Sequence, residues 1–240
     1  MNLTALGVYG PYPKKNCGTS SYLLKAGDKN ILLDAGEGSF SRLSAIIPPE
    51  ELDMIFLSHS HFDHTADVGV YNYYFESLSK KGKPFDKSII AYFDDGSSSV
   101  SVIKNSPFFV PFAISDGAVL NMGGLSFEFH RVKHPAITHS ITVCDGVRRF
   151  SYTGDTNDCD ALDIIYSKSD VVLADGCFLP EDWSEIKPHL SIDIIKNYSL
   201  KWGARSIVGH LNPDYDGETL EKEISERGLL MAKEGKVFEI

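Results

Sequence analysis

Residues 57–64, LSHSHFDH, constrain this chain more than any other stretch, because they place three histidines and one aspartate within six positions. They follow directly on the apolar run Met54 to Leu57, which reads as a strand. Neutral imidazole is the commonest metal ligand in proteins, and carboxylate is a common companion on zinc. The pattern suits a chain that leaves a strand and enters a helix. The first two histidines can then bind one metal ion, while the Asp-His pair points toward a second.

Further ligand candidates follow later in the chain. A two-metal hydrolytic site needs another nitrogen ligand on the first metal, a carboxylate that bridges both, and a further ligand on the second. His134, Asp155 and His210 are the candidates, and the last two end short apolar strands, where a rigid scaffold can deliver a ligand. His130 and His139 lie within five positions of His134, so either could be the third nitrogen ligand. His134 fits best because it sits at the end of a strand, before a proline.

This arrangement resembles the metallo-β-lactamase superfamily. The resemblance rests on HxHxDH at 59–64, a lone histidine at 134, TGDT at 153–156, the histidine at 210, and an early strand with Asp-x-Gly over 30–36. It covers the chain from about residue 3 to the end. It implies an α/β (α+β) chain in the four-layer αββα sandwich of that superfamily, with metals at the open edge where two halves meet.

The resemblance also assigns the ligands. Three sets follow: His59, His61 and His134 on the first metal; Asp63, His64 and His210 on the second; and Asp155 bridging both. Two divalent cations, five neutral imidazoles, two carboxylates and one hydroxide sum to a charge of about +1. We therefore expect two divalent metal ions, Zn²⁺ in the first place with Mn²⁺ or Fe as alternatives. They would activate a shared hydroxide that attacks the substrate.

A second pair of motifs resembles one branch of the superfamily more loosely. Residues 174–178 (ADGCF) and 188–191 (PHLS) are similar to the Glu-x-Thr-Phe and His-Ser-Thr motifs of the tRNA 3′-processing (ribonuclease Z-like) and cyclic-nucleotide phosphodiesterase branch. In that branch the histidine, steadied by the acid, contacts the phosphate or protonates the leaving oxygen. The resemblance implies this role for His189, with Asp175 as its orienting partner. Together with the ligand Asp63, these are the expected catalytic residues.

The expected substrate is small. Only 21 positions separate residues 134 and 155, which leaves no room for the long arm that grips tRNA in the tRNA-processing enzymes. The net charge of −10 also disfavours large structured RNA, because phosphate contacts by basic residues supply most nucleic-acid affinity. The glyoxalase-II branch fits poorly, since only 30 residues follow His210. We expect a phosphodiesterase that acts on a small-molecule or nucleotide-like anion.

Three alternatives remain open. The same site could hydrolyse a lactone, a thioester or another carbonyl substrate. Iron could replace zinc in an oxygen-using or redox enzyme, although HxHxDH without Glu at its second position argues against the diiron flavoprotein version. The chain could also be a non-catalytic metal-binding scaffold, although such members generally lose ligands and this chain keeps all seven candidates.

The remaining composition describes one globular unit. A hydrophobic content of 42% with 23% charged residues is ordinary for a globular protein, and we expect a single domain over 1–240 with pseudo-equivalent halves of about 1–120 and 121–240. No apolar run approaches the roughly 20 residues that span a bilayer, and the N-terminus lacks a basic lead-in and a cleavage site. The four cysteines are scattered without a CxxC, which favours reduced thiols. We therefore expect a cytoplasmic protein without membrane contact, and the sequence leaves a homodimer open.

Strands and helices are expected to alternate along the chain. Periodicity and turn signals predict strands over 3–9, 21–25, 30–33, 54–57, 88–93, 125–132, 140–143, 150–153, 171–174, 206–208 and 236–240. They predict helices over 39–47, 67–79, 157–167, 191–202 and 218–233, the fourth with Ser191 as its N-cap. The apolar and aromatic stripe of the helix over 67–79 is expected to pack into the core. This pattern indicates two sheets packed face to face with helices outside.

Overall fold

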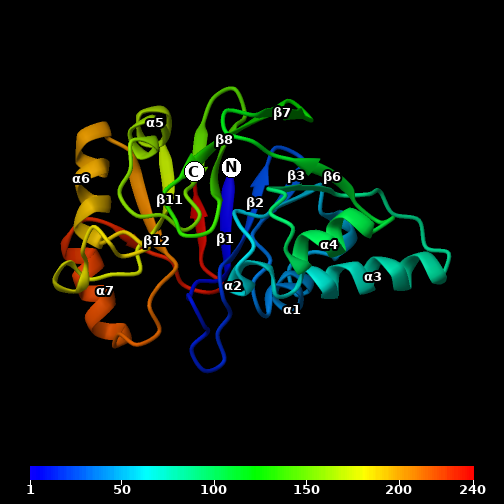
Figure 1. Cartoon of the computed structure of the whole chain (residues 1–240), viewed down its shortest axis with the longest axis horizontal. Helices are drawn as coiled ribbons and strands as arrows, with labels where there is room; N and C mark the ends of the chain where they lie inside the picture. The colour runs from blue at the N-terminus through cyan, green and yellow to red at the C-terminus, as the bar shows by residue number, and fades with distance from the viewer.

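The structure, a computed structural model, describes all 240 residues and has four layers. Two seven-stranded sheets lie face to face in the middle, and helices cover the outer face of each (Figure 1). The two chain termini lie next to each other (Figure 1). The expected α/β sandwich is confirmed.

The first sheet joins the beginning of the chain to its end. Its strands, in spatial order, are β14 (Val237–Glu239), β1 (Asn2–Gly7), β2 (Ser21–Ala26), β3 (Lys29–Leu33), β4 (Met54–Phe56), β5 (Ile89–Tyr92) and β6 (Val110–Ala113). The pairings from β14 to β3 are antiparallel, and those from β3 to β6 are parallel. The carboxyl ends of β3 and β4 therefore reach the same edge of the sheet.

The second sheet comes from the later part of the chain. Its strands, in spatial order, are β13 (Leu230–Met231), β12 (Arg205–Gly209), β11 (Val171–Asp175), β10 (Arg149–Tyr152), β9 (Thr138–Cys144), β8 (Leu125–Val132) and β7 (Val119–Met122). Strands β7 to β10 form an antiparallel meander, and β10 to β13 run parallel. As in the first sheet, the carboxyl ends of the parallel strands share one edge.

The helices form the outer layers. The first sheet is covered by α1 (Ser39–Ser44), α3 (Val68–Lys80) and α4 (Ser98–Asn105), with the short α2 (Phe62–Thr65) and the 3₁₀ turn η1 (Pro49–Glu51) nearby. The second sheet is covered by α5 (Ala161–Lys168), α6 (Ile192–Trp202) and α7 (Gly217–Glu226), and η2 (Pro180–Asp182) lies in the loop before α6. None of these helices is long and apolar enough to cross a membrane.

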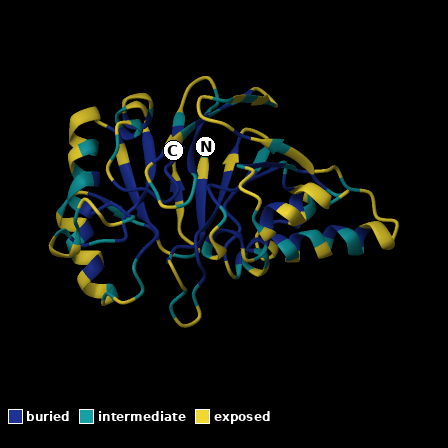
Figure 2. Ribbon diagram, in the orientation of Figure 1, coloured by how far each residue is buried: buried dark blue, intermediate teal, exposed yellow.

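Alternation along the strands separates two apolar layers. Successive side chains of a strand point to opposite faces of its sheet. In β4, Phe56 points between the sheets and stacks on Phe129 of β8, with ring centroids 5.8 Å apart. Its neighbour Ile55 packs instead with the helices, against the cluster that contains Tyr71 and Phe75 of α3. Figure 2 shows the result, with buried strands inside and exposed residues on the outer turns of the helices. The predicted core role of the α3 stripe is confirmed.

Phe129 gives a direct test of the core between the sheets. Its side chain is fully buried. We expect Phe129→Ala to lower the free energy of unfolding by about 3–5 kcal/mol, because the truncation removes apolar contacts and leaves a cavity between two rigid sheets. Denaturant unfolding measures this difference. Val147→Ala, at a side chain that is 87% exposed, is the control, and it should change the stability by less than about 0.5 kcal/mol. An equally small effect at Phe129 would contradict this packing.

Several element boundaries differ from the sequence prediction. The helix predicted over 157–167 begins only at Ala161, because the preceding residues form a turn at the sheet edge. The helix predicted over 218–233 ends at Glu226, since Gly228 takes a left-handed backbone (φ 73°) and the chain then enters β13. Ser191 occupies the N-cap of α6 but makes no capping bond with its side chain. The sequence analysis missed the short elements α2, α4, β6, β7 and β13. In β6 the central Pro111 argues against a strand in the sequence, and the structure tolerates it because β6 is an edge strand.

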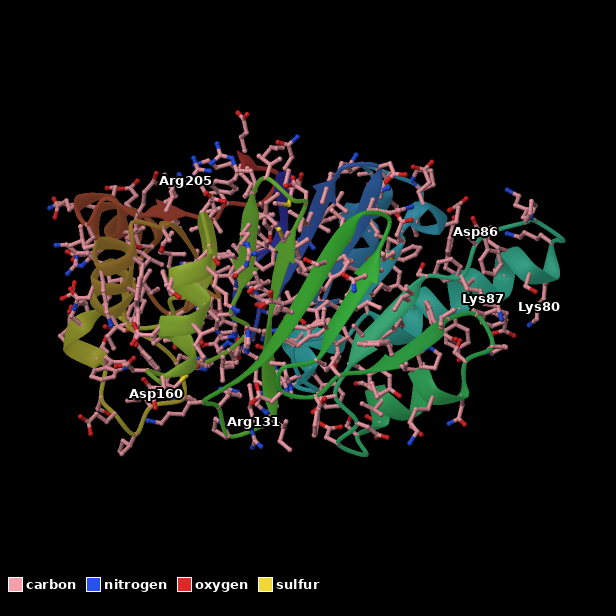
Figure 3. All side chains as sticks on the ribbon, turned by 90° about the horizontal axis from the view of Figure 1, so that it is seen from above. Lys80, Asp86, Lys87, Arg131, Asp160 and Arg205 are labelled. Carbon is pink, nitrogen blue, oxygen red and sulfur yellow. The ribbon has the colours of Figure 1, made fainter.

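Charged side chains populate the periphery. Figure 3 shows Lys80, Asp86 and Lys87 at the far end of α3, and Arg205 on the opposite side of the molecule. The four cysteines are all free thiols.

Candidate metal centre

The candidate ligands meet at one edge of the sandwich, where strands from both sheets end. His59, His61, Asp63 and His64 follow β4 and lead into α2, which lies at this edge (Figure 1). His134 follows β8, Asp155 follows β10, and His210 directly follows β12. The structure thus brings together seven residues that are spread over 152 positions of sequence, and all seven belong to the ligand set expected from the sequence.

The first group contains three histidines and Asp155, and each offers an atom within 4.8 Å of the others. His59 Nε2 lies 2.9 Å from His61 Nδ1, which lies 3.3 Å from His134 Nε2. Asp155 Oδ2 is 3.7 Å from His59 Nε2 and 3.9 Å from His134 Nε2. Atoms that bind one zinc ion at about 2.0–2.2 Å are separated by distances of this order.

The second group contains Asp63, His64, Asp155 and His210, again within 4.8 Å of one another. His64 Nε2 lies 3.2 Å from Asp155 Oδ1 and 3.5 Å from Asp63 Oδ2. His210 Nε2 lies 3.2 Å from Asp155 Oδ2 and 3.3 Å from Asp63 Oδ2. Asp155 is the one residue that these two groups share.

Two buried atoms at this place indicate that the residues fit a cation. His64 Nε2 and Asp155 Oδ1 are both buried and have no hydrogen-bond partner. A buried polar atom without a partner costs free energy, and native structures contain few of them. A divalent metal ion bound by both atoms would satisfy them. The donor set of imidazoles and carboxylates suits zinc and related first-row metals.

Two histidine pKa values are lowered in the first group, and two are raised in the second. Burial lowers the pKa of His59 and of His134. Burial would also lower the pKa of His64 and His210, but nearby carboxylates, Asp155 first among them, outweigh it and raise both values. For Asp155, burial would raise the pKa, but His210 and His64 outweigh it and hold it well below the usual range. The carboxylates of the second group therefore stabilise positive charge on the neighbouring imidazoles, as they would stabilise a bound cation.

Asp34 holds His64 in place, and the sequence analysis assigned it no role. Its Oδ2 lies 2.6 Å from His64 Nδ1 and accepts hydrogen bonds from Tyr152 Oη (2.6 Å) and Ser58 Oγ (2.8 Å). With Nδ1 bonded to a carboxylate, His64 turns Nε2 toward the centre of the site, which is how outer residues orient metal-binding histidines. Asp34 itself has a left-handed backbone (φ 57°), a conformation that is retained mainly at functional sites. The Asp-x-Gly motif was the available signal.

Asp34→Asn is expected to weaken metal binding by about 10–100-fold, because the amide keeps the shape but loses the charge that orients His64. Competition with a chromogenic chelator measures this affinity. Asp53→Asn is the matched control, since Asp53 precedes the opposite end of β4 and accepts from Lys29 and Asn30 there. Equal affinities for the two variants and the parent protein would show that Asp34 does not orient a ligand.

His189 and Asp175 form a second pair at the same edge. His189 Nδ1 lies 2.6 Å from Asp175 Oδ2, which also accepts from the backbone N–H of Thr156 at 2.9 Å. The His189 ring stacks on His210, with centroids 4.6 Å apart, and its Nδ1 lies 3.8 Å from Asp155 Oδ2. Both members of the pair are buried. The imidazole is thus held by a carboxylate immediately beside the metal ligands.

The other two histidines lie outside these groups. The His139 ring stacks on Phe93, with centroids 5.2 Å apart, and its backbone N–H donates to Ser58 O. His130 lies 3.7 Å from Glu128 at the outer face of β8. His134, by contrast, is oriented by a contact of 3.1 Å between its Nδ1 and the carbonyl oxygen of Pro188.

The backbone at Gly10 passes close to the ligand atom of His210. A Cβ at Gly10 would lie 2.0 Å from His210 Nε2, so only glycine fits beside this ligand atom. His210 has a left-handed backbone (φ 48°), which turns its side chain at the end of β12. The sequence analysis missed Gly10, because its neighbour in space lies 200 positions away.

Known proteins share this architecture. The sequence model of the Beta-lactamase superfamily domain matches residues 29–222. The chain belongs to this family. It is 30% identical to the probable metallo-hydrolase YhfI of Bacillus subtilis over 177 residues, which are 74% of this chain and 72% of that protein. The crystal structure of YhfI superposes with a TM-score of 0.91 at 25% identity and covers 100% of this chain and 99% of that one.

Two other similar proteins are more distant. Ribonuclease Z of Mycolicibacterium gilvum is 33% identical over 70 residues, 29% of this chain and 24% of that protein. The crystal structure described as a new diphosphatase from the PhnP family has a TM-score of 0.71 at 16% identity and covers 100% of this chain and 97% of that one, which shows a common fold. Family and relatives identify the chain as a metallo-hydrolase with the metallo-β-lactamase fold and a candidate His/Asp metal site.

Proposed function

We propose that this metallo-hydrolase is a phosphodiesterase that holds two divalent metal ions, with zinc preferred, and cleaves a small or nucleotide-like anionic substrate. The proposed ligands are His59, His61 and His134 for one ion, Asp63, His64 and His210 for the other, and Asp155 for both. When bound, the two ions supply Lewis acidity, which lowers the pKa of a water molecule and polarises the phosphoryl oxygens. Two carboxylates only partly neutralise two divalent charges, so the site favours an anion.

The observation that carries the proposal is the pair of His189 and Asp175. An imidazole whose Nδ1 is bonded to a carboxylate can present Nε2 as a proton donor, and the carboxylate stabilises its charged form. His189 stacks directly on His210, and both residues are buried. A phosphodiester needs such a donor because its departing alkoxide is strongly basic. We assign His189 the protonation or binding of the substrate, and Asp175 its orientation.

The shape of the site supports a small substrate. Residues between His134 and Asp155 form β9, β10 and the short connections 135–137, 145–148 and 153–154, so no arm projects from this part of the chain. The chain also carries a net charge of −10, which repels extended nucleic acid. The names of the two more distant relatives, a ribonuclease and a diphosphatase, both describe hydrolysis at phosphorus.

A substrate panel tests the reaction class. The purified protein would be stripped with a chelator, reloaded with Zn²⁺ or Mn²⁺, and assayed with bis-(p-nitrophenyl) phosphate, a lactone and a thioester. We expect metal-dependent turnover in which kcat/KM for the phosphodiester exceeds that for both carbonyl substrates. Faster turnover of the lactone or thioester would assign the site to carbonyl hydrolysis. Absence of turnover on every substrate would leave a metal-binding scaffold.

A further inference from the structure

We propose that Asn157 is a positioning residue that clamps residues 183–187 against the metal edge and thereby sets the position of His189. This inference rests on the proposed function, because it assigns to Asn157 the placement of the group that we propose protonates or binds the substrate. Asn157 belongs to neither metal group, and its side chain is almost completely buried.

The backbone of Asn157 already connects two ligand segments. It lies two residues after Asp155 in the turn between β10 and α5. Its N–H donates to the carbonyl oxygen of Lys133 at 2.8 Å, and Lys133 directly precedes His134. The residue is therefore fixed to the edge where the two ligand groups meet.

The side chain of Asn157 forms hydrogen bonds to residues 183–187, which lie in neither a helix nor a strand. Its Nδ2 donates to the carbonyl oxygens of Ser184 (3.4 Å), Glu185 (3.1 Å) and Lys187 (2.5 Å). Its Oδ1 accepts from Trp183 Nε1 at 3.1 Å. Only a primary amide can donate to carbonyl oxygens at one end and accept an N–H at the other, so these partners also fix its orientation.

The clamped loop leads directly to His189. Between η2 and α6 the chain forms no helix or ladder strand over residues 183–190, and Ile186 at its tip is 94% exposed. Trp183 Nε1 also donates to the carbonyl oxygen of His189 at 3.1 Å, and the carbonyl of Pro188 lies 3.1 Å from His134 Nδ1. Release of the loop would therefore move His189 away from its place beside the substrate. A displacement of about 1 Å is enough to cost roughly 10²-fold in rate.

The test variant is Asn157→Asp, which keeps the shape and the acceptor for Trp183. The second carboxylate oxygen cannot donate and instead repels the three loop carbonyls. We expect kcat on a nucleoside phosphodiester to fall by about 10–100-fold, with KM and metal content little changed. The loss should be smaller on bis-(p-nitrophenyl) phosphate, whose leaving group needs little protonation. Asn105→Asp, an exposed amide-to-acid change on α4 where Asn105 donates to Ser101, is the matched control.

A second readout follows the loop itself. In a Trp202→Phe background Trp183 is the only tryptophan, and acrylamide quenching then reports how well it is covered. Asn157→Asp should raise the quenching in both metal-free and metal-loaded protein, whereas Asn105→Asp should not. If Asn157→Asp fails to fold, Trp183→Phe removes the donor to Asn157 and His189 and should give the same dependence on the leaving group.

The outcomes separate this inference from the proposed function. If His189→Ala loses turnover while Asn157→Asp keeps full turnover and parental quenching, the clamp is wrong and the proposed function stands. If His189→Ala keeps full turnover, the proposed function fails, and with it the role of the clamp in the reaction. Loss of metal in Asn157→Asp, or a dependence on the leaving group that differs from that of His189→Ala, would place Asn157 in support of the metal site and overturn the inference.

Discussion

Asp155→Ala is expected to lose at least one of the two metal ions and, with it, nearly all turnover. Asp155 is the only residue common to both ligand groups, with Oδ1 3.2 Å from His64 Nε2 and Oδ2 3.2 Å from His210 Nε2. Its removal takes away a ligand from each ion and the negative charge that draws two cations together. Without that charge, the first cation would repel a second more strongly. Elemental analysis after dialysis against metal-free buffer measures the stoichiometry.

The control for this variant is Asp160→Ala, an exposed residue at the start of α5 that Figure 3 shows at the rim. It makes the same change of net charge, so it should retain the parental metal content and turnover. Circular dichroism and thermal unfolding in excess metal would establish that Asp155→Ala is folded. A full metal complement in folded Asp155→Ala would show that this carboxylate bridges nothing.

His189→Ala is expected to keep both metals and to lower phosphodiester turnover by roughly 10²–10⁴-fold, the range typical of losing a positioned general acid or base. His189 is not among the proposed ligands, but its ring stacks on His210 and its Nδ1 is bonded to Asp175. The variant therefore removes a proton donor while it leaves the ligand atoms in place. Steady-state kinetics with parallel metal analysis measure both quantities.

The dependence on the leaving group distinguishes two roles for His189. A general acid matters most for a basic nucleoside alkoxide, so the loss should be larger there than for p-nitrophenolate. Equal losses on both substrates would mean that His189 binds the phosphate. His130→Ala is the control, because His130 lies on the outer face of β8 and outside the metal groups. No loss in His189→Ala on either substrate would remove His189 from the mechanism.

The ligand set could be proposed from the sequence because its members carry their chemistry in the residue type. HxHxDH is contiguous, Asp155 and His210 follow short apolar segments that read as strands, and His134 follows a strand with alternating apolar residues. The sandwich followed from the resemblance together with strand alternation, as in β4, where Phe56 and Ile55 face opposite sides. Such patterns depend only on neighbouring residues, so a single sequence contains them.

The supporting residues could not be predicted because their partners are distant in sequence. In the sequence, Asp34 shows only as the acidic residue of an Asp-x-Gly motif after a strand. In the fold, β3 and β10 bring it to Tyr152, which is 118 positions away. The sequence predicted that Asn157 begins a helix, whereas α5 begins at Ala161. The neighbouring residues give no sign that the Asn157 amide binds the loop before His189. Gly10 was given no role, because nothing near it in the sequence indicates that it lies beside His210. In each case the role arises from packing between sheets and loops, which local propensity does not encode.

The central claim is a two-metal site centred on Asp155, and anomalous X-ray diffraction at the zinc edge from crystals of the zinc-loaded protein tests it most directly. We predict two anomalous peaks in each chain, one among His59, His61 and His134 and one among Asp63, His64 and His210, with the Asp155 carboxylate contacting both. A single peak, or two peaks that share no contact with Asp155, would contradict the account.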